Sequence, residues 1–414
     1  MAEPDLQKKT EAFSALGKEM RQVACLLNQK LNGGGDLHAD PAQNPVVQSL
    51  LNAVEQSQAY NPWFTREETA RALGALAHML QKDKLEAWIS RYRGQFGTSR
   101  SPKTVAVIMA GNIPLVGFHD FMCVLMAGHR FFGKLSSQDP VLPVTIAHML
   151  SKHAPGLEHC IKFTSAQIDP GEADAVIATG SDNTARYFEY RFGNKPHIIR
   201  KNRNSAALLS GREPDNVLAD LGEDVFSYFG LGCRNVSHLL IPEDFDLARL
   251  SAVWAPYRNI TTHPKYSHNL RYHRALFTLK DKPFTDAGCC LFTESPDTAS
   301  PVSVVHFSRY SSFSEAGAFL RDKKEQLQCV VAADSFFQPK NEKGDRPHDE
   351  EALPAAGNTL PGLEAIPPDL EAVTPGIEAV LPGTEALPPG KSQYPDPDDY
   401  ADGADTMEFL LGLP

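Results

Sequence analysis

The sequence predicts an α/β protein with two parallel sheets, preceded by a layer of helices. From residue 104 to residue 338, short runs rich in β-branched residues alternate with segments whose apolar side chains recur at helical spacing. Such alternation is typical of parallel strands joined by crossover helices. Residues 5–31, by contrast, keep helical spacing along their whole length and are followed closely by three consecutive glycines.

The first hundred residues are expected to be helical and to pack on the domain that follows. Apolar spacing predicts helices at 5–31, 45–58 and 65–80. The third helix begins at Thr65-Arg66-Glu67-Glu68, a capping-box sequence in which the threonine hydroxyl can accept a hydrogen bond from a free backbone amide. We interpret residues 1–100 as a helical layer and assign no chemistry to it.

Residues 101–209 are expected to form a Rossmann-like nucleotide-binding domain. Ligands of such sheets bind beyond the carboxyl ends of the strands, so the loops there become candidates for a site. None of these loops is a G-x-G-x-x-G or Walker A sequence, but a glycine-serine turn that opens a helix can still hold a pyrophosphate with backbone amides. The predicted strands are 104–110, 131–135, 160–164, 175–179, 197–201 and 206–209, and the loops are 110–114, 134–137 and 179–182.

Residues 210–338 are expected to form a second α/β domain, and Cys233 lies near its start. Helical spacing from Glu213 to Phe229 precedes this cysteine, and a predicted strand at 237–241 follows it. A thiol on a connector between two rigid elements can be presented to a substrate, and nearby dipoles can tune its pKa. The alternative is a buried cysteine that packs as a small apolar side chain. Further strands are predicted near 288–293, 302–307 and 328–333.

Charge and cysteine content argue against several classes of function. The net charge is −11, and residues 340–414 alone carry −12, so the rest of the chain is close to neutral. A neutral body argues against nucleic acid and against a membrane surface as partners. The seven cysteines show no disulfide or metal-ligand spacing, and no apolar run is long enough to span a bilayer. We therefore expect a cytoplasmic protein with no metal site and no integral membrane segment.

Beyond Gln338 the composition changes abruptly and predicts a disordered insert. A seven-residue repeat runs from residue 363 to residue 390, and the proline in every repeat forbids a continuous helix. Residues 394–414 become apolar again and are expected to dock on the body close to where the chain left it. The insert itself, residues 339–393, should then be dispensable.

Four short motifs, taken in their order along the chain, resemble those of the LuxC-type fatty acyl-CoA reductases, a branch of the aldehyde dehydrogenase superfamily. The likeness covers most of residues 60–338 and resumes at 398–414. It implies an aldehyde dehydrogenase-like fold, in which a cofactor domain is followed by a catalytic domain with a reactive cysteine. The motifs are Ala110-Gly111-Asn112-Ile113-Pro114, Lys134-Leu135-Ser136-Ser137, Thr179-Gly180-Ser181 and Gly230-Leu231-Gly232-Cys233.

The resemblance also gives each motif a role. It implies that Cys233 is the nucleophile and that the amide of Asn112 contributes to an oxyanion hole. Ser137 stands where NAD-preferring relatives often place a glutamate, and an acid there would repel a 2′-phosphate, so NADPH is the expected cofactor. Cofactor binding falls, on the same resemblance, to Lys134, Ser136, Ser137, Gly180 and Ser181.

One departure from the superfamily concerns the acid that activates water. Aldehyde-oxidising members carry a glutamate where this sequence has Arg200 or a neighbour, and no acid lies between Arg191 and Arg212. The resemblance then implies NADPH-dependent reduction of a long-chain fatty acyl-CoA to the aldehyde, with release of coenzyme A. A CoA-independent aldehyde dehydrogenase and a non-catalytic protein that uses the proline-rich repeat as a ligand are the alternatives. The oligomeric state stays open, a homo-oligomer included.

Overall fold

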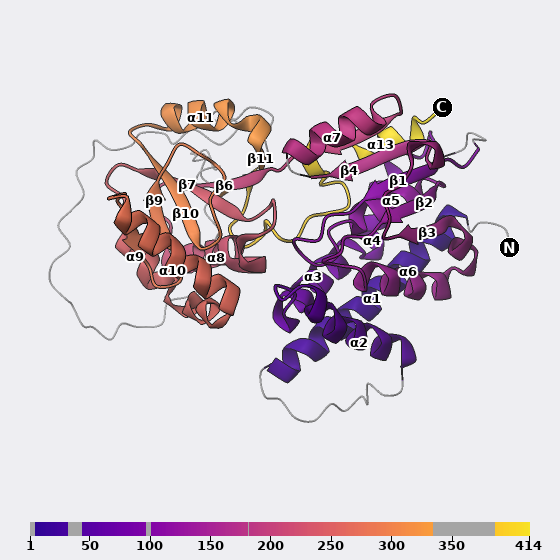
Figure 1. The fold of residues 1–414 in the computed structure, drawn as a ribbon, viewed down its shortest axis with the longest axis horizontal. Helices are drawn as coiled ribbons and strands as arrows, with labels where there is room; N and C mark the ends of the chain where they lie inside the picture. The colour runs from indigo at the N-terminus through magenta and orange to yellow at the C-terminus, as the bar shows by residue number, and fades with distance from the viewer. Residues whose placement is uncertain (1–4, 32–43, 97–100, 181, 334–385) are drawn as a thin grey trace, which may run out of the picture.

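The computed structural model consists of two lobes, which the C-terminal segment bridges (Figure 1). One lobe holds the N-terminal helices and the first sheet, and the other holds the second sheet with its helices. The residues described are 5–31, 44–96, 101–180, 182–333 and 386–414. Within these ranges, no helix combines the length and the apolar character that a membrane crossing requires.

The N-terminal helical layer packs on the helices that cover the first sheet. α1 lies against α3 and α6, and it buries Phe13, Leu16 and Met20 completely. The hydroxyl of Thr65 accepts a hydrogen bond from the backbone N–H of Glu68 at 3.3 Å, which confirms the threonine half of the predicted capping box. The helices are α1 (Leu6–Leu31), α2 (Pro45–Tyr60), α3 (Arg66–Met79) and α4 (Lys82–Ser90).

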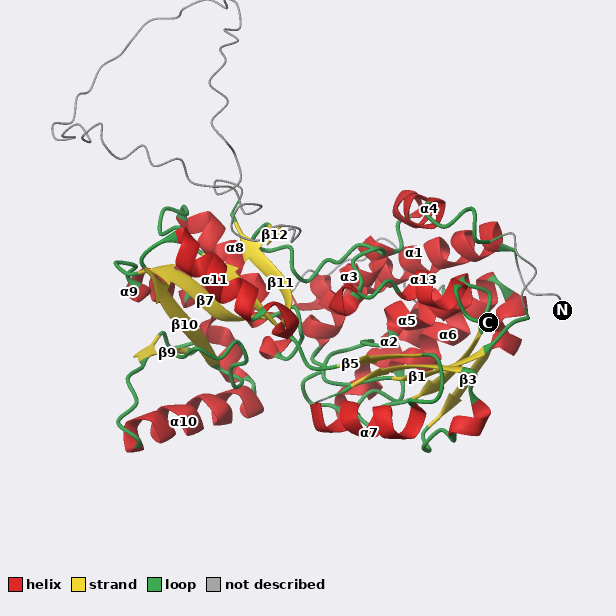
Figure 2. Ribbon diagram, turned by 90° about the horizontal axis from the view of Figure 1, so that it is seen from above, coloured by secondary structure: helices red, strands yellow, loops and turns green. Residues whose placement is uncertain are grey.

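The first sheet has five parallel strands in the order β3-β2-β1-β4-β5. Helices α5 and α6 cover one face, and α7 covers the other (Figure 2). Successive side chains of a strand point to opposite faces, so Val105 and Val107 pack with the α5 side while Ala106 packs with α7. The elements are β1 (Thr104–Ile108), α5 (Phe118–Met126), β2 (Arg130–Lys134), α6 (Leu142–His153), β3 (Ile161–Thr164), β4 (Ala175–Thr179), α7 (Asp182–Phe192) and β5 (His197–Arg200).

The second sheet has seven strands in the order β12-β11-β6-β7-β10-β9-β8, and only the β8/β9 pair is antiparallel among its described neighbours. Leu239 faces a core that includes Leu221 and Trp254, whereas Leu240 faces Leu320 of α11. The elements are β6 (Asn204–Leu208), α8 (Asp215–Phe226), β7 (Val236–Pro242), α9 (Leu247–Val253), α10 (Pro264–Leu279), β8 (Thr285–Asp286), β9 (Leu291–Glu294), β10 (Val304–Tyr310), α11 (Phe313–Asp322), β11 (Leu327–Ala332) and β12 (Ala386–Leu387).

The strand expected at 206–209 belongs to the second sheet and not to the first. It forms β6, which pairs with β7 on one side and with β11 on the other. Parallel neighbours in one sheet need a crossover of a dozen or more residues, and only residues 201–203 separate β5 from β6. The chain therefore changes sheets at this point, which places the boundary between the sheets before Asn204 and not after Leu209.

The C-terminal segment, residues 386–414, touches both lobes. β12 extends the second sheet by pairing Ala386 with Val330 of β11. α13 (Thr406–Leu411) packs against α5 beside the first sheet, and its Met407 and Leu410 are fully buried. The segment therefore begins beside the strand from which the chain departed and ends on the other lobe, as the yellow ribbon in Figure 1 shows.

The predicted insert, residues 339–393, extends too far at its C-terminal end. Ser392 is fully buried, and both its backbone N–H and its hydroxyl donate to the carboxylate of Asp224, at 3.0 and 2.7 Å. Hydrogen bonds to a buried carboxylate hold residues that carry little apolar surface of their own. The expected disorder of residues 339–385 lies outside the described residues.

Deleting residues 341–380 should leave the melting temperature nearly unchanged, whereas truncation after Pro397 should lower it clearly. The truncation removes α13, whose buried Met407, Leu410 and Leu411 each contribute about 1.5–3 kcal/mol relative to exposure. Thermal unfolding followed by circular dichroism of the full-length, deleted and truncated chains tests this. Equal melting temperatures for the deleted and the truncated chain would contradict a stabilising role of the docked segment.

Candidate active site

Three strand ends of the first sheet lie side by side at one edge. Ile108 at the end of β1 pairs with Lys134 of β2, and its other neighbour in the sheet is β4. The chain order of the strands reverses between β1 and β4, which is where ligands of such sheets bind. The predicted positions that follow or end these strands are Asn112, Lys134, Ser136, Ser137 and Gly180, while Ser181 lies outside the described residues.

The loops that follow β1 and β2 are in contact. A Cβ atom added to Gly111 would lie 2.4 Å from the Oγ atom of Ser136, so this close approach requires glycine. The side-chain amide of Asn61 donates to the carbonyl of Gly111 at 3.0 Å, which ties the loop to the helical layer. Ser136 therefore shapes the loop that carries Asn112.

Lys134 and Ser137 offer polar groups at the same edge. Ser137 is exposed, and Lys134 is half-buried and forms no ion pair with any described residue. Gly180 follows β4, and its backbone N–H donates to the carbonyl of Arg200 at 3.1 Å. The ammonium group of Lys134 and the hydroxyl of Ser137 can both donate hydrogen bonds, so they suit an anionic ligand group such as a phosphate.

Cys233 lies on a turn between α8 and β7. The helix predicted to continue to Phe229 ends at Phe226, because Tyr228 and Phe229 adopt left-handed backbone angles with φ of 51° and 57°. Gly230 continues the turn with φ of 75°. Left-handed angles cost a non-glycine residue about 1–2 kcal/mol, so contacts from the surroundings must stabilise this turn.

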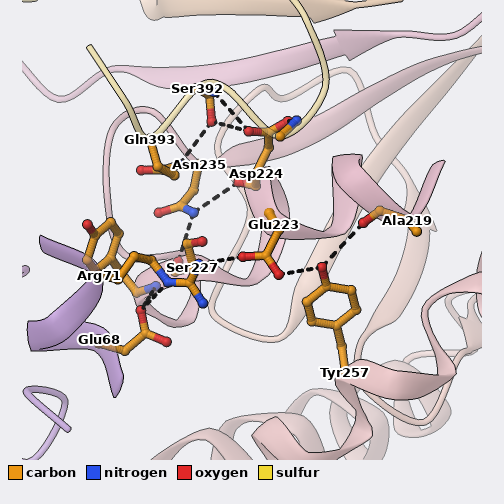
Figure 3. Close-up of polar contacts among 12 residues, drawn as sticks. Glu68, Arg71, Ala219, Glu223, Asp224, Ser227, Asn235, Tyr257, Ser392 and Gln393 are labelled. Atoms are coloured by element: carbon orange, nitrogen blue, oxygen red, sulfur yellow. Dashed lines mark hydrogen bonds and ion pairs between the residues drawn. The ribbon is translucent and has the colours of Figure 1, made fainter. Parts of the chain in front are cut away.

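Asn235 fixes the turn from its C-terminal side. Its side-chain oxygen accepts the backbone N–H of Gly232 at 2.8 Å, and its amide donates to the carbonyls of Asp224 and Ser227 at 3.0 and 2.8 Å. The carboxylate of Asp224 in turn accepts the two hydrogen bonds from Ser392 (Figure 3). A chain of hydrogen bonds thus joins the C-terminal segment to the residue that precedes Cys233.

The Asn112 loop and the Cys233 turn meet across the boundary between the lobes. The side-chain amide of Asn112 donates to the backbone carbonyl of Leu231 at 2.7 Å, two residues before Cys233. An amide nitrogen carries two hydrogens, so one of them stays available to another acceptor. The structure therefore places the loop of Asn112 against the turn that carries Cys233.

The charges around Cys233 come from the turn itself, from the end of β5 at Arg200 and from the C-terminal segment. Cys233 is exposed, yet enough protein surrounds its sulfur that burial raises the pKa of the thiol. The positive charge of Arg234 lowers this pKa, and the carboxylate of Asp402 raises it. Arg234 is itself paired with Asp399. The thiol is therefore protonated at neutral pH, and a reaction at its sulfur must move that proton.

Arg200 ends β5 in the stretch where the resemblance would place a water-activating glutamate at this residue or a neighbour. Its buried guanidinium pairs with Asp120 at 2.7 Å and donates to the hydroxyl of Thr406 at 2.9 Å. The carboxylate that acts on Cys233 is instead that of Asp402, which contacts Arg203 at 3.0 Å. Arg200 thus joins α5, β5 and α13.

Sequence reasoning missed three residues of this site. Asn235 follows Cys233 by two positions, so its place in the same motif was a signal that went unused. Asp224 lies in the predicted helix before the turn, with no local sign that Ser392 would bind it. Asp402 reaches the site from a segment 169 positions after Cys233, and it has a left-handed φ of 63°. No spacing rule connects such distant segments.

Asp139 stabilises the loop of Asn112 through a hydrogen bond to its backbone. Its carboxylate accepts the backbone N–H of Leu115 at 2.9 Å, and Leu115 has a left-handed φ of 59°. The Oδ1 atom of Asp139 has no hydrogen-bond partner among the described residues. Burial raises the pKa of Asp139 to about 7.

Asp139→Asn should stabilise the protein increasingly as the pH rises from about 4 to about 7, and the effect should level off above pH 7. A folded-state pKa of about 7, above the ordinary value of 3.8, means that the folded wild type holds a proton that the unfolded chain releases, so its stability falls between these two pH values. The asparagine variant does not titrate at this position. The free energy of unfolding of the variant should exceed that of the wild type by at most about 4 kcal/mol. Urea unfolding of both chains at several pH values measures it. A difference that does not vary with pH would contradict the raised pKa.

Comparison with known proteins supports the fold but not a family assignment from sequence. No family model matches the chain, and no curated protein matches it in sequence. Proline utilization A from Corynebacterium freiburgense is similar in structure, with a TM-score of 0.52 and 13% identity, covering 80% of this chain and 38% of that chain. Aldehyde dehydrogenase C from Pseudomonas syringae has a TM-score of 0.50 and 13% identity, covering 79% and 75%. The chain therefore has the aldehyde dehydrogenase fold.

Proposed function

We propose that the protein reduces a long-chain fatty acyl-CoA to the aldehyde with NADPH, through an acyl-enzyme on Cys233. The observation that carries this proposal is the hydrogen bond that joins Asn112 to the turn of Cys233. Arg200, in the stretch where a water-activating acid would stand, supports transfer of the acyl group over its hydrolysis. The similar aldehyde dehydrogenase from Pseudomonas syringae, solved with NAD+ and octanal, supports a nicotinamide cofactor.

The residues of this chain account for the acyl transfer. The sulfur of Cys233 attacks the thioester carbonyl, and negative charge develops on the carbonyl oxygen. The second N–H of the Asn112 amide and the backbone N–H of Cys233 would donate to that oxygen. The carbon–sulfur bond to coenzyme A then breaks, and the proton that Cys233 gave up ends on the departing sulfur. The acyl group is then held as a thioester of Cys233.

The edge of the first sheet suits NADPH. Lys134 and Ser137 would hold a 2′-phosphate, and Asp139, the acid of the same loop, is buried and directed at Leu115. The backbone around Gly180, at the end of β4, would lie near the pyrophosphate. Bound there, NADPH would supply the hydride that converts the acyl group to the aldehyde.

A CoA-independent aldehyde dehydrogenase is the second candidate, and Asp402 favours it. A carboxylate that acts on Cys233 could activate a water molecule for hydrolysis of the acyl-enzyme. Burial raises the pKa of the Asp402 carboxyl although Arg203 lowers it, and a raised pKa suits a general base. The contact with Arg203 opposes this role because it occupies one of the carboxylate oxygens. We therefore rank acyl transfer to and from coenzyme A first.

Purified protein should oxidise NADPH in the presence of fatty acyl-CoA, and Cys233→Ala should abolish both this activity and the covalent acyl adduct. Alanine removes the nucleophile and leaves no large cavity, because Cys233 is exposed. A series of acyl-CoA chain lengths, with mass spectrometry of the protein, provides the test. An adduct of equal yield on the variant would exclude Cys233, and sustained NADPH formation from aldehyde and NADP+ without coenzyme A would favour the second candidate.

Ser137→Glu should shift the preference from NADPH toward NADH. A carboxylate at this exposed position would repel a 2′-phosphate and could accept hydrogen bonds from the free ribose hydroxyls. The ratio of kcat/KM for the two cofactors measures the shift, and Ser151→Glu on α6, away from the strand ends, serves as the charge-matched control. An unchanged ratio in the Ser137 variant would place the adenosine elsewhere.

A further inference from the structure

We infer that Glu68 is a positioning residue for acyl transfer, because its carboxylate holds the strained turn that presents Cys233 to Asn112. This inference rests on the proposed function in one respect, namely that Cys233 accepts an acyl group. Glu68 belongs to α3 of the N-terminal layer, far from Cys233 in sequence. It touches neither the nucleophile nor the Asn112 amide, so its effect must pass through the backbone of the turn.

The contact between Glu68 and the turn is short and buried. The Oε2 atom of Glu68 accepts the backbone N–H of Tyr228 at 2.6 Å, and the residue is only 8% exposed. Tyr228 is the first of the left-handed residues before Cys233. Without this carboxylate, the buried N–H of Tyr228 would have no partner, and the residue would still be in a strained conformation. The unpaired N–H and the strain would both favour a rearrangement of the turn. The capping-box sequence therefore supplies Glu68 to a distant loop.

A second contact keeps the carboxylate of Glu68 in place. The Nε atom of Arg71 lies 3.3 Å from the same oxygen, and the guanidinium of Arg71 also pairs with Glu223 of α8. The hydroxyl of Tyr257 donates to Glu223 at 2.7 Å, which completes the arrangement shown in Figure 3. The ion pairs of Arg71 with Glu68 and Glu223 thus link α3 to α8, the helix that leads into the turn.

An aromatic contact from the same layer supports the next residue of the turn. The ring of Phe229 lies 5.0 Å from that of Trp63 and 4.5 Å from that of His263, measured between centroids. Two residues later, the carbonyl of Leu231 accepts the hydrogen bond from Asn112. A turn that relaxed at Tyr228 would carry Leu231 with it and change the alignment of Asn112 with Cys233.

Four full-length proteins test this role: wild type, Glu68→Ala, Glu68→Gln and Glu67→Gln. In Glu68→Gln, the amide oxygen can take the position of Oε2 and still accept the N–H of Tyr228. Glu67 is the exposed neighbour on the same helix and controls for loss of charge. Two rates are measured at Cys233: acylation by p-nitrophenyl acetate, which needs the oxyanion hole, and alkylation by iodoacetamide, which does not. Alkylation of the buried Cys123 and Cys289 reports opening of the fold.

Acylation of Cys233 should fall about 10- to 100-fold in Glu68→Ala, because a small displacement of reacting groups costs rates of this size. Alkylation of Cys233 should stay close to the wild-type rate, and Cys123 and Cys289 should stay protected. Glu68→Gln should recover most of the acylation rate, and Glu67→Gln should equal the wild type. This pattern of rates would show that Glu68 affects the alignment of Cys233 with Asn112, and that it affects neither the reactivity of the thiol nor the stability of the fold.

Three results would overturn the inference. Unchanged acylation in Glu68→Ala would show that the turn holds without the carboxylate. An equal loss of acylation and alkylation would assign Glu68 to the reactivity of the thiol, and simultaneous alkylation of Cys123 and Cys289 would assign it to folding. Because the nitrophenyl ester contains no coenzyme A, a wild type that reacts with this ester but with no acyl-CoA would refute the proposed function and leave this inference testable.

Discussion

The three residues between β5 and β6 determine where the site forms. They are too few for a crossover within one parallel sheet, so the chain must leave the first sheet and begin the second almost at once. Arg200 at the end of β5 and Ser205 at the start of β6 consequently lie close to the same boundary. The hydroxyl of Ser205 donates to the backbone carbonyl of Cys233 at 2.9 Å, and the loop of Asn112 reaches the turn from the first sheet.

Buried acids hold two of the left-handed residues near this site. Glu68 accepts the N–H of Tyr228, and Asp139 accepts that of Leu115, both left-handed residues. Asp224 similarly accepts N–H groups from the start of the C-terminal segment, at Gly390 and at Ser392. Each N–H that such an acid accepts favours its ionised form, but burial disfavours that form by more. Desolvation raises the pKa of all three acids.

The sequence predicted what depends on local pattern and missed what depends on distant contacts. The alternation of strands and helices, the cap at Thr65 and the connector position of Cys233 follow from spacing. The prediction placed β6 in the wrong sheet, because strand propensity does not say which sheet a strand joins. The short connection between β5 and β6 was the feature that excluded the first sheet. Two supports of the turn, Glu68 and Ser392, could not be predicted, since each is a polar side chain that meets a partner more than 150 positions away.

The docking of residues 386–414 has a consequence for the order in which the protein matures. Ribosomes deliver this segment after β1 to β11, yet Ser392 completes the hydrogen-bond chain to the turn and Thr406 binds the guanidinium of Arg200. Until those residues emerge, Asp224 and Arg200 would be buried charges with fewer partners, which is unfavourable. A nascent chain that contains β1 to β11 but not this segment should therefore carry Cys233 on a turn that is not yet fixed in one conformation. The site should become active only late in synthesis.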